Sequence, residues 1–416
     1  VDATIAGSNS TGAANEAKEA LQAETPLAPI PVNVSIQDFL SHYRPDFAPI
    51  EGGEPVVHIQ MRPSAVPAAF ELLVALQAPP PPTEPPRVSL TIVVDNTESM
   101  GTGLAKAKEA LLAITGGLHD GDTVQLLTAQ PGAGPIEFTI APGDGSLASV
   151  IEGLVLEPEM DLPSLLDAGY AAANANYVPN AMNRMLLISD GAAEAGSLPA
   201  SIETSADQQT SEIRLTTLGT GPAREHAHRF LPTASRFGRG AYRYLGSVAD
   251  AKALAGRFHE LFGVAMDDVS LSLGIPWYFK VERPFVGAVS ASNIPIEPQY
   301  VAPNGSMTFV FRLVACGPSA HTDFGGEISA TFNWTSPIDG QPRLSPLSVV
   351  LPDAIANQMT PDLDKMLIVA SYAEGLRSLD PKRLSNALSL AQGNVGNEHL
   401  VEIAGLIEKH PLLASP

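Results

Sequence analysis

The sequence predicts an α/β protein in which a doubly wound, mostly parallel sheet is inserted in an antiparallel β-sandwich and followed by C-terminal helices. A continuous β-branched run over residues 88–94 begins a segment in which strand and helix patterns alternate up to about residue 262. This alternation is typical of a parallel sheet covered on both faces. Apolar residues recur with period two before and after this segment, which indicates strands with one buried face.

The first 86 residues divide into a leader and the first part of the sandwich. Residues 1–34 are rich in small and polar residues and contain several prolines, so we expect a flexible leader. Residues 35–86 are expected to hold an N-terminal helix, the period-two strands of residues 55–77 and a stiff proline-rich linker that ends at Pro86.

Residues 87–264 carry the alternating pattern of the inserted domain. The expected strands are 88–94, 123–129, 136–140, 185–189, 213–219 and 242–245. The expected helices are 104–118, 146–154, 162–173, 223–236 and 248–262. Strands of this spacing, separated by helices, form parallel pairs through right-handed crossovers.

Residues 265–352 revert to strands, and residues 353–416 read as helices. Clear period-two alternation occurs at 269–273, 277–281, 307–313 and 328–334. An economical arrangement pairs these strands with those of residues 55–77, which makes the α/β segment an insertion. The final helices are predicted at 363–376, 381–392 and 397–409, with Thr360 and Asp380 as N-caps before Pro361 and Pro381.

The amino-acid composition of the chain limits the kinds of molecule that it can bind. The chain has 416 residues, of which 45 are acidic and 24 basic, so its net charge is −21. Nucleic acids and anionic membranes attract basic surfaces, so neither is an expected partner. The single cysteine, Cys316, excludes an intrachain disulfide and a thiolate zinc site. No run of about 18 apolar residues is present to span a membrane, and no signal segment is visible, so we expect any targeting signal to have been removed.

Oxygen-bearing side chains gather where the first parallel strand ends. Asp95, Thr97 and Ser99 occupy alternate positions on a tight loop directly after that strand. Asp190 directly follows a later strand, and Ser164 lies at the start of a helix between the two. Ligands of open α/β sheets bind at the carboxyl ends of the strands. Carboxylates and hydroxyls suit a hard cation such as Mg²⁺, which takes oxygen ligands in an octahedron and retains several waters.

The order Asp-x-Thr-x-Ser, a later hydroxyl and then Ser-Asp-Gly resembles the metal-ion-dependent adhesion site of the von Willebrand factor A domain. Thr97 stands where the family has serine, and Ser164 where it usually has threonine, so both positions retain a hydroxyl. The whole layout is similar to a bacterial group of such proteins with flanking β-strands and a helical C-terminal segment. The resemblance implies that Asp95, Thr97, Ser99, Ser164 and Asp190 hold Mg²⁺, with Mn²⁺ or Ca²⁺ as alternatives, some of them through water.

The same resemblance implies binding rather than catalysis. An open coordination position would accept an acidic side chain from a partner protein, in an adhesion role at the cell surface, in the periplasm or in the medium. One alternative is a structural subunit of a surface or envelope assembly, including a homo-oligomer. A metal-dependent hydrolase is less favoured, because phosphatases that form an aspartyl-phosphate have a second Asp where this chain has Thr97. The sequence also lacks a phosphate-binding P-loop and a serine-hydrolase elbow, so we expect no enzymatic activity.

Overall fold

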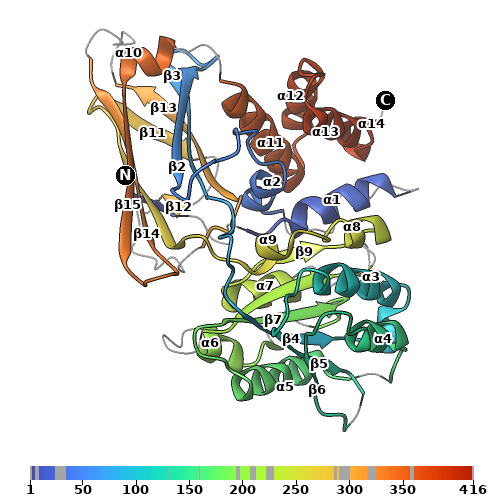
Figure 1. Cartoon of the computed structure of the whole chain (residues 1–416). Coiled ribbons are helices and arrows are strands. Elements are labelled where there is room, and N and C mark those ends of the chain that lie inside the picture. Colours follow the sequence, from blue (N-terminus) through green and yellow to red (C-terminus); the bar gives the residue numbers. More distant parts are fainter. Residues whose placement is uncertain are drawn as a thin grey trace. The chain divides into compact units, whose positions relative to one another are not determined.

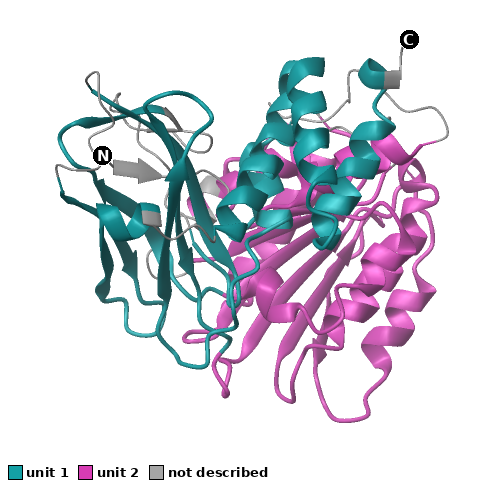
Figure 2. Ribbon diagram, turned by 90° about the horizontal axis from the view of Figure 1, so that it is seen from above, with its two compact units in different colours: residues 1–9, 34–81, 264–416 teal, residues 10–33, 82–263 magenta. Residues whose placement is uncertain are grey.

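Three β-sheets organise the described part of the chain in a computed structural model (Figure 1). The structure describes residues 2–4, 9–23, 34–130, 132–158, 160–193, 197–206, 212–221, 229–284, 288–289, 300–316, 325–356 and 360–414. The chain divides into two compact units (Figure 2). Unit 1 comprises residues 1–9, 34–81 and 264–416, and unit 2 comprises residues 10–33 and 82–263.

Unit 2 contains the predicted parallel sheet, with strand order β6-β5-β4-β7-β8-β9. All neighbouring strands in it are parallel except β6, which runs antiparallel to β5. The strands are β4 (Val88–Val94), β5 (Thr123–Thr128), β6 (Ile136–Thr139), β7 (Met182–Ser189), β8 (Arg214–Gly219) and β9 (Tyr242–Tyr244). β4 is central and all its residues are buried, as its β-branched run predicts.

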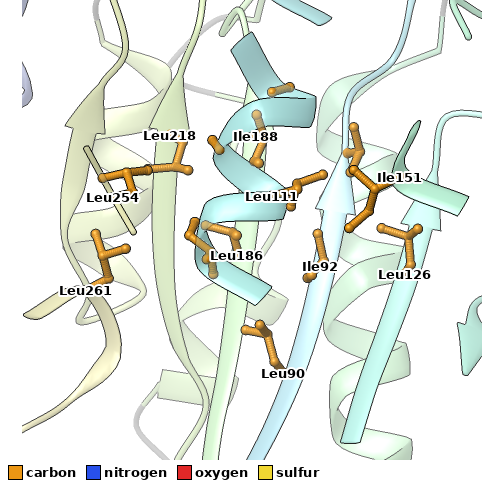
Figure 3. Close-up of a cluster of buried hydrophobic side chains, with 14 of the residues drawn as sticks. Leu90, Ile92, Leu111, Leu126, Ile151, Leu186, Ile188, Leu218, Leu254 and Leu261 are labelled. Carbon is orange, nitrogen blue, oxygen red and sulfur yellow. The ribbon is translucent and has the colours of Figure 1, made fainter. Parts of the chain in front are cut away.

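Helices cover both faces of this sheet. Leu90 and Ile92 of β4 share an apolar cluster with Leu111 of α3 (Figure 3). Successive residues of a strand point to opposite faces, and Val93 packs against Gly169 of α5. The helices are α3 (Gly103–Thr115), α4 (Ser146–Gly153), α5 (Leu162–Ala175), α6 (Ser201–Ala206), α7 (Phe230–Phe237), α8 (Val248–Lys252) and α9 (Phe258–Phe262), with a 3₁₀ turn, η1 (Glu98–Met100), before α3. The sheet is therefore doubly wound.

The structure differs from the expected flexible leader at residues 2–4, which form strand β1 (Asp2–Thr4), and at residues 9–23. Helix α1 (Gly12–Gln22) buries Ala13, Ala17 and Leu21, and it lies along the edge strand β9. The Thr11 amide donates to the Tyr242 carbonyl at 3.0 Å, which pairs an otherwise open strand edge. The helix can approach this closely because its buried face consists mainly of alanine. Residues 1, 5–8 and 24–33 of the expected leader lie outside the described residues.

Unit 1 contains two antiparallel sheets, ordered β12-β1-β10-β14-β15 and β11-β13-β3-β2. The first comprises β1 (Asp2–Thr4), β10 (Asp267–Gly274), β12 (Ala288–Val289), β14 (Glu327–Thr335) and β15 (Pro342–Val350). The second comprises β2 (Val56–Pro63), β3 (Ala69–Gln77), β11 (Phe279–Pro284) and β13 (Ser306–Ala315).

The strands that precede and follow the α/β segment pair with each other. β3 and β13 run antiparallel over nine residue pairs, from Ser306 opposite Gln77 to Val314 opposite Ala69. Buried Phe309 of β13 contacts Phe332 of β14 across the two sheets, with ring centroids 6.1 Å apart. This pairing confirms that the parallel sheet is inserted in a β-sandwich.

Helices complete unit 1. They are α2 (Ile36–His42), α10 (Leu351–Ala356), α11 (Pro361–Ser378), α12 (Pro381–Gln392), α13 (Glu398–Glu408) and α14 (Pro411–Ala414). Asp380 caps α12 as predicted, because its carboxylate accepts from the amides of Lys382 and Arg383. Thr360 occupies the N-cap position of α11, but its hydroxyl makes no capping hydrogen bond.

Two helical glycines in this unit offer a matched test of packing. A Cβ on Gly375 in α11 would lie 2.7 Å from Leu384 Cδ2, whereas a Cβ on Gly405 in α13 would meet nothing within 4 Å. We expect Gly405→Ala to raise the free energy of unfolding by about 0.5–1 kcal/mol through helix propensity. Gly375→Ala should lower it by about 1 kcal/mol or more, because α12 must move. Urea unfolding of both variants checks this, and equal effects would contradict it.

Candidate functional site

The loop after β4 is fixed by Asn96, a residue that the sequence analysis did not single out. Its buried side chain donates to the Val155 carbonyl at 2.7 Å and accepts from the Ala129 amide at 2.8 Å. The Glu157 amide donates to the Asn96 carbonyl at 2.7 Å. Gly101 then turns the chain into α3 with a φ of +44°, which glycine adopts at little cost. Three hydrogen bonds of Asn96 to other segments thus fix the backbone around residues 95–99.

Asp95 is the centre of a hydroxyl network. Thr97 Oγ1 donates to Asp95 Oδ1 at 2.7 Å, and Ser189 Oγ donates to Asp95 Oδ2 at 2.6 Å. The Asp95 amide continues the sheet by donating to the Ile188 carbonyl at 2.9 Å. The carboxylate therefore receives one hydroxyl from its own loop and one from the end of the neighbouring strand β7.

The hydroxyls of Thr97 and Ser99 are hydrogen-bonded to each other, at a separation that two adjacent ligands of a small divalent cation could also have. Their Oγ atoms lie 2.9 Å apart. Adjacent corners of an octahedron with metal–oxygen bonds of about 2.1 Å are about 2.9–3.0 Å apart, whereas the longer bonds of Ca²⁺ give about 3.3–3.7 Å. Because Thr97 gives its proton to Asp95, Ser99 must be the donor in the hydrogen bond between the two hydroxyls, which leaves one lone pair on Thr97 and both on Ser99 available. Ser99 is exposed, so this oxygen edge is accessible from solvent.

Asp190 follows β7 beside this network. The Ala192 amide donates to Asp190 Oδ1 at 3.0 Å, and the Gly191 amide donates to Ser189 Oγ at 2.9 Å. Asp190 is 8% exposed, and its charge acts on Asp95. Two buried carboxylates at one sheet edge are the negative charge that a divalent cation would neutralise.

Burial raises the pKa of Asp95 above its ordinary value, and the nearby charge of Asp190 adds to the rise. The hydrogen bonds from Ser189 and Thr97 oppose the rise by stabilising the carboxylate. The ionised form of Asp95 is therefore less favoured in the folded chain than in water.

Ser164 lies in the first turn of α5, as predicted, but its hydroxyl is engaged elsewhere. Ser164 Oγ and the Ser164 amide donate to Asp161 Oδ2 at 2.6 and 3.0 Å. Asp161 is the N-cap of this helix. The structure thus links Asp95, Thr97 and Ser99 by direct hydrogen bonds and couples Asp190 to Asp95 electrostatically. No hydrogen bond among the described residues links Ser164 to that group.

Two further residues take part that were not among the predicted ligands. Ser189 holds the second oxygen of Asp95, and Asp161 holds the hydroxyl of Ser164. Ser189 could have been found from its position, since it is the last residue of a buried strand and directly precedes Asp190. Asp161 carries the ordinary sequence features of an N-cap, an acidic residue followed within two positions by proline.

The donor set consists of carboxylate and hydroxyl oxygens, the type of ligand that hard cations take. Within the described residues, no group of three or more His, Cys, Asp and Glu side chains is placed to hold a metal ion. Any cation at this edge would therefore depend on the Thr97 and Ser99 hydroxyls and on water in addition to the carboxylates. Among the helices that the structure describes, none is both long and apolar enough to cross a membrane.

Comparison with solved structures identifies the fold. The chain is similar to a von Willebrand factor type A protein from Catenulispora acidiphila, with 16% identity and a TM-score of 0.53 over 86% of this chain and 89% of that one. No protein-family model matches the sequence, and no curated protein matches it significantly. At this identity the similarity shows the fold alone. The chain thus has a von Willebrand factor A fold with flanking elements, as the resemblance in its sequence predicts.

Two weaker similarities accompany it. The ArnB paralog VWA2 from Sulfolobus acidocaldarius is 11% identical, with a TM-score of 0.43 over 87% of this chain and all of that one. The pilus adhesin SpaC from Lactobacillus rhamnosus GG is 13% identical, with a TM-score of 0.32 over 71% of this chain and 47% of that one. Both are too distant to support a functional inference.

Proposed function

We propose that this protein binds a partner protein through a divalent cation held at the carboxyl edge of the parallel sheet. Thr97 and Ser99 supply hydroxyl ligands, and Asp95 and Asp190 supply the compensating charge, in part through water. Ser164 joins them if its hydroxyl leaves Asp161. The cation, when bound, supplies a Lewis-acidic position for a carboxylate of the partner. The observation that carries this proposal is that the Thr97 and Ser99 hydroxyls lie together beside two buried carboxylates, Asp95 and Asp190.

We propose Mg²⁺, or a cation of similar size such as Mn²⁺, with Ca²⁺ as an alternative. The two hydroxyls are hydrogen-bonded at 2.9 Å, a separation that adjacent ligands of an ion with bonds of about 2.1 Å could keep. Hydroxyl ligands add no charge, so the ion keeps a strong attraction for an incoming acidic group. The chain itself carries a net charge of −21 and repels an acidic partner at long range. Binding should therefore depend strongly on divalent ions.

The proposal places the protein outside the cytoplasm, in an adhesion role without enzymatic activity. A structural subunit of an envelope assembly would use the same fold as a scaffold and would form an oligomer that persists in EDTA. A hydrolase would turn over a phosphoester in a reaction that depends on Asp95. The scaffold does not require the Thr97 and Ser99 hydroxyls, and the hydrolase would need a second Asp where this chain has Thr97, so we favour cation-dependent binding.

Ser99→Ala tests the cation site with little effect on the fold, because Ser99 is exposed. Excess Mg²⁺ should raise the melting temperature of the wild type, since a ligand present at about 100 times its Kd stabilises the folded state by about 2.7 kcal/mol. We expect Ser99→Ala to lose most of this rise and to match the wild type in EDTA. Differential scanning fluorimetry, with Mn²⁺ and Ca²⁺ in parallel, measures the shifts.

Ser149→Ala is the matched control, because Ser149 is an exposed serine on α4 and not a candidate ligand. It should retain the full Mg²⁺ response. Identical wild-type melting curves in EDTA and in Mg²⁺ would contradict the proposed site. Partner binding is tested by retention of envelope proteins of the source organism on the immobilised chain in Mg²⁺ and their release by EDTA.

A further inference from the structure

We propose that helix α1 is a strap over the edge strand β9, and that its closure depends on a proton held by the Glu19 carboxyl. When this proton leaves, the strap opens and uncovers the edge of the parallel sheet, where an unpaired strand can bind another chain. All the groups involved belong to unit 2, and the inference does not depend on the proposed cation site.

Polar contacts fasten α1 to β9 at several points along the helix. At the start, the Thr11 amide donates to the Tyr242 carbonyl at 3.0 Å. The Tyr242 hydroxyl donates to Glu16 Oε1, and one turn further along the Tyr244 hydroxyl meets Glu19 Oε2. Both tyrosine side chains are almost fully buried. The helix and the edge strand therefore meet through two tyrosine–glutamate contacts.

The Tyr244 hydroxyl lies between two oxygen atoms. One is Glu19 Oε2, and the other is the Gly221 carbonyl oxygen at a distance of 2.6 Å. A hydroxyl has one proton to donate, and a carbonyl oxygen has none. Both contacts are therefore hydrogen bonds only when Glu19 is protonated and donates to Tyr244, which in turn donates to Gly221. An ionised Glu19 would take the tyrosine proton and leave two oxygens facing each other at 2.6 Å without a proton between them.

The surroundings of Glu19 also favour its neutral form. Burial raises the pKa of Glu19 and is the largest influence on it, and the nearby charges of Asp250 and Glu16 add to the rise. The hydrogen bond with Tyr244 and the charge of Lys106 oppose the rise without cancelling it. Within the described residues, the charged groups that act on Glu19 thus come from α3, α8 and its own helix. Their net effect leaves its carboxyl easier to protonate than in water.

The strap should therefore close more firmly in acid. A carboxyl whose pKa is raised in the closed state holds its proton more tightly there than in the open state. Closure has its full stability below the ordinary pKa of a glutamate, about 4.3, and loses part of it as pH rises through the raised value. The equilibrium constant for opening should increase about tenfold for each unit by which closure raises the pKa. An open helix of 11 residues is marginal in water, so opening should expose its amides.

Hydrogen exchange of the full chain, followed by mass spectrometry from about pH 5 to about pH 8, tests this sign. After correction for intrinsic rates, the protection of the α1 amides should fall with rising pH, with the buried strand β4 as internal reference. Glu19→Gln keeps a donor for Tyr244 but cannot ionise. It should remove the fall and protect α1 better than the wild type at the alkaline end. Glu152→Gln, at an exposed position of α4, is the matched control and should retain the fall.

An ion pair between an ionised Glu19 and Lys106 would give the opposite result. Glu19→Gln would then lower the protection of α1 at neutral pH, and this outcome would overturn the inference. So would equal protection of α1 and β4 in the wild type, because α1 would then open only together with the whole sheet.

Carbon-13 NMR of the Glu19 carboxyl, assigned by its absence from the spectrum of Glu19→Gln, is a second measurement. Titration above the ordinary pKa of a glutamate is expected, and titration at or below it would contradict a proton-held strap. None of these measurements involves Mg²⁺, so their results leave the proposed cation site to its own test.

Discussion

Asp95→Asn is expected to abolish the response to Mg²⁺ and to leave the cation-free chain at least as stable as the wild type. Asparagine removes one of the two buried negative charges and cannot accept from both Thr97 and Ser189 in the way that the carboxylate does. Loss of groups that orient metal ligands lowers affinity about 10- to 100-fold, and loss of the charge adds to this. We expect a loss of at least about 100-fold, measured by Mg²⁺ titration calorimetry.

The pH dependence of stability has a definite sign at this residue. The pKa of Asp95 is raised in the folded chain by burial and by Asp190. Between its ordinary pKa and the raised one, the folded state binds more protons than the unfolded state. The contribution of Asp95 to the free energy of unfolding therefore falls as pH rises through this window. Asp95→Asn should lack this fall, and urea unfolding without divalent ions from pH 4 upward measures the difference.

Asp122→Asn is the matched control at the opposite edge of the same sheet. Asp122 is buried, and its carboxylate accepts from the amides of Val88 at 2.8 Å and His119 at 2.7 Å. An asparagine amide there must face one of these donors, so the free energy of unfolding should fall by about 1–3 kcal/mol. The Mg²⁺ response should persist. If Asp122→Asn lost that response as Asp95→Asn does, the effect would be one of general destabilisation rather than of a specific site.

The sequence was most informative where function depends on local order along the chain. Asp95, Thr97 and Ser99 belong to one loop, so their spacing alone predicts that their oxygens meet, and the structure joins them by hydrogen bonds. The placement of Asp190 followed from the rule that parallel strands end at one edge. The sequence could not show that Ser164 turns to Asp161, because this depends on the rotamer of one side chain within the first helical turn.

In the N-terminal segment, by contrast, the local sequence did not predict the structure. Helix α1 is short and rich in alanine, and in isolation such a helix is marginal in water. Its order comes from burial and from the pairing of Thr11 with Tyr242, more than 200 residues away in sequence. The local composition predicts flexibility there, because it carries no information on contacts with residues far away in the sequence. The pairing of β3 with β13 is also long-range, but it was foreseeable because both strands carry a strong period-two pattern.

Gly169→Leu is expected to destabilise the inserted domain strongly and to weaken the cation site together with it. A Cβ at Gly169 would lie 2.5 Å from Val93 Cγ2 and 2.7 Å from Met185 Cε, and both of these side chains are fully buried. The helix cannot keep its position against β4 and β7 once a larger residue is present. Overpacking of this kind costs about 3 kcal/mol, and we expect a loss of at least this size in urea unfolding.

The contact of Gly169 with the sheet also positions residues near the proposed cation site, so Gly169→Leu should affect Mg²⁺ binding as well as stability. α5 carries Ser164 and follows its N-cap Asp161, whereas β4 leads directly into Asp95. A displacement of α5 from the sheet would therefore separate Ser164 and Asp161 from the Asp95 loop, and the remaining folded protein should bind Mg²⁺ more weakly. Ala168→Leu, at an exposed neighbouring position of the same helix, should change stability by less than about 0.5 kcal/mol and leave Mg²⁺ binding intact. Equally small effects of Gly169→Leu and Ala168→Leu would show that close contact between α5 and the sheet does not position this side of the site.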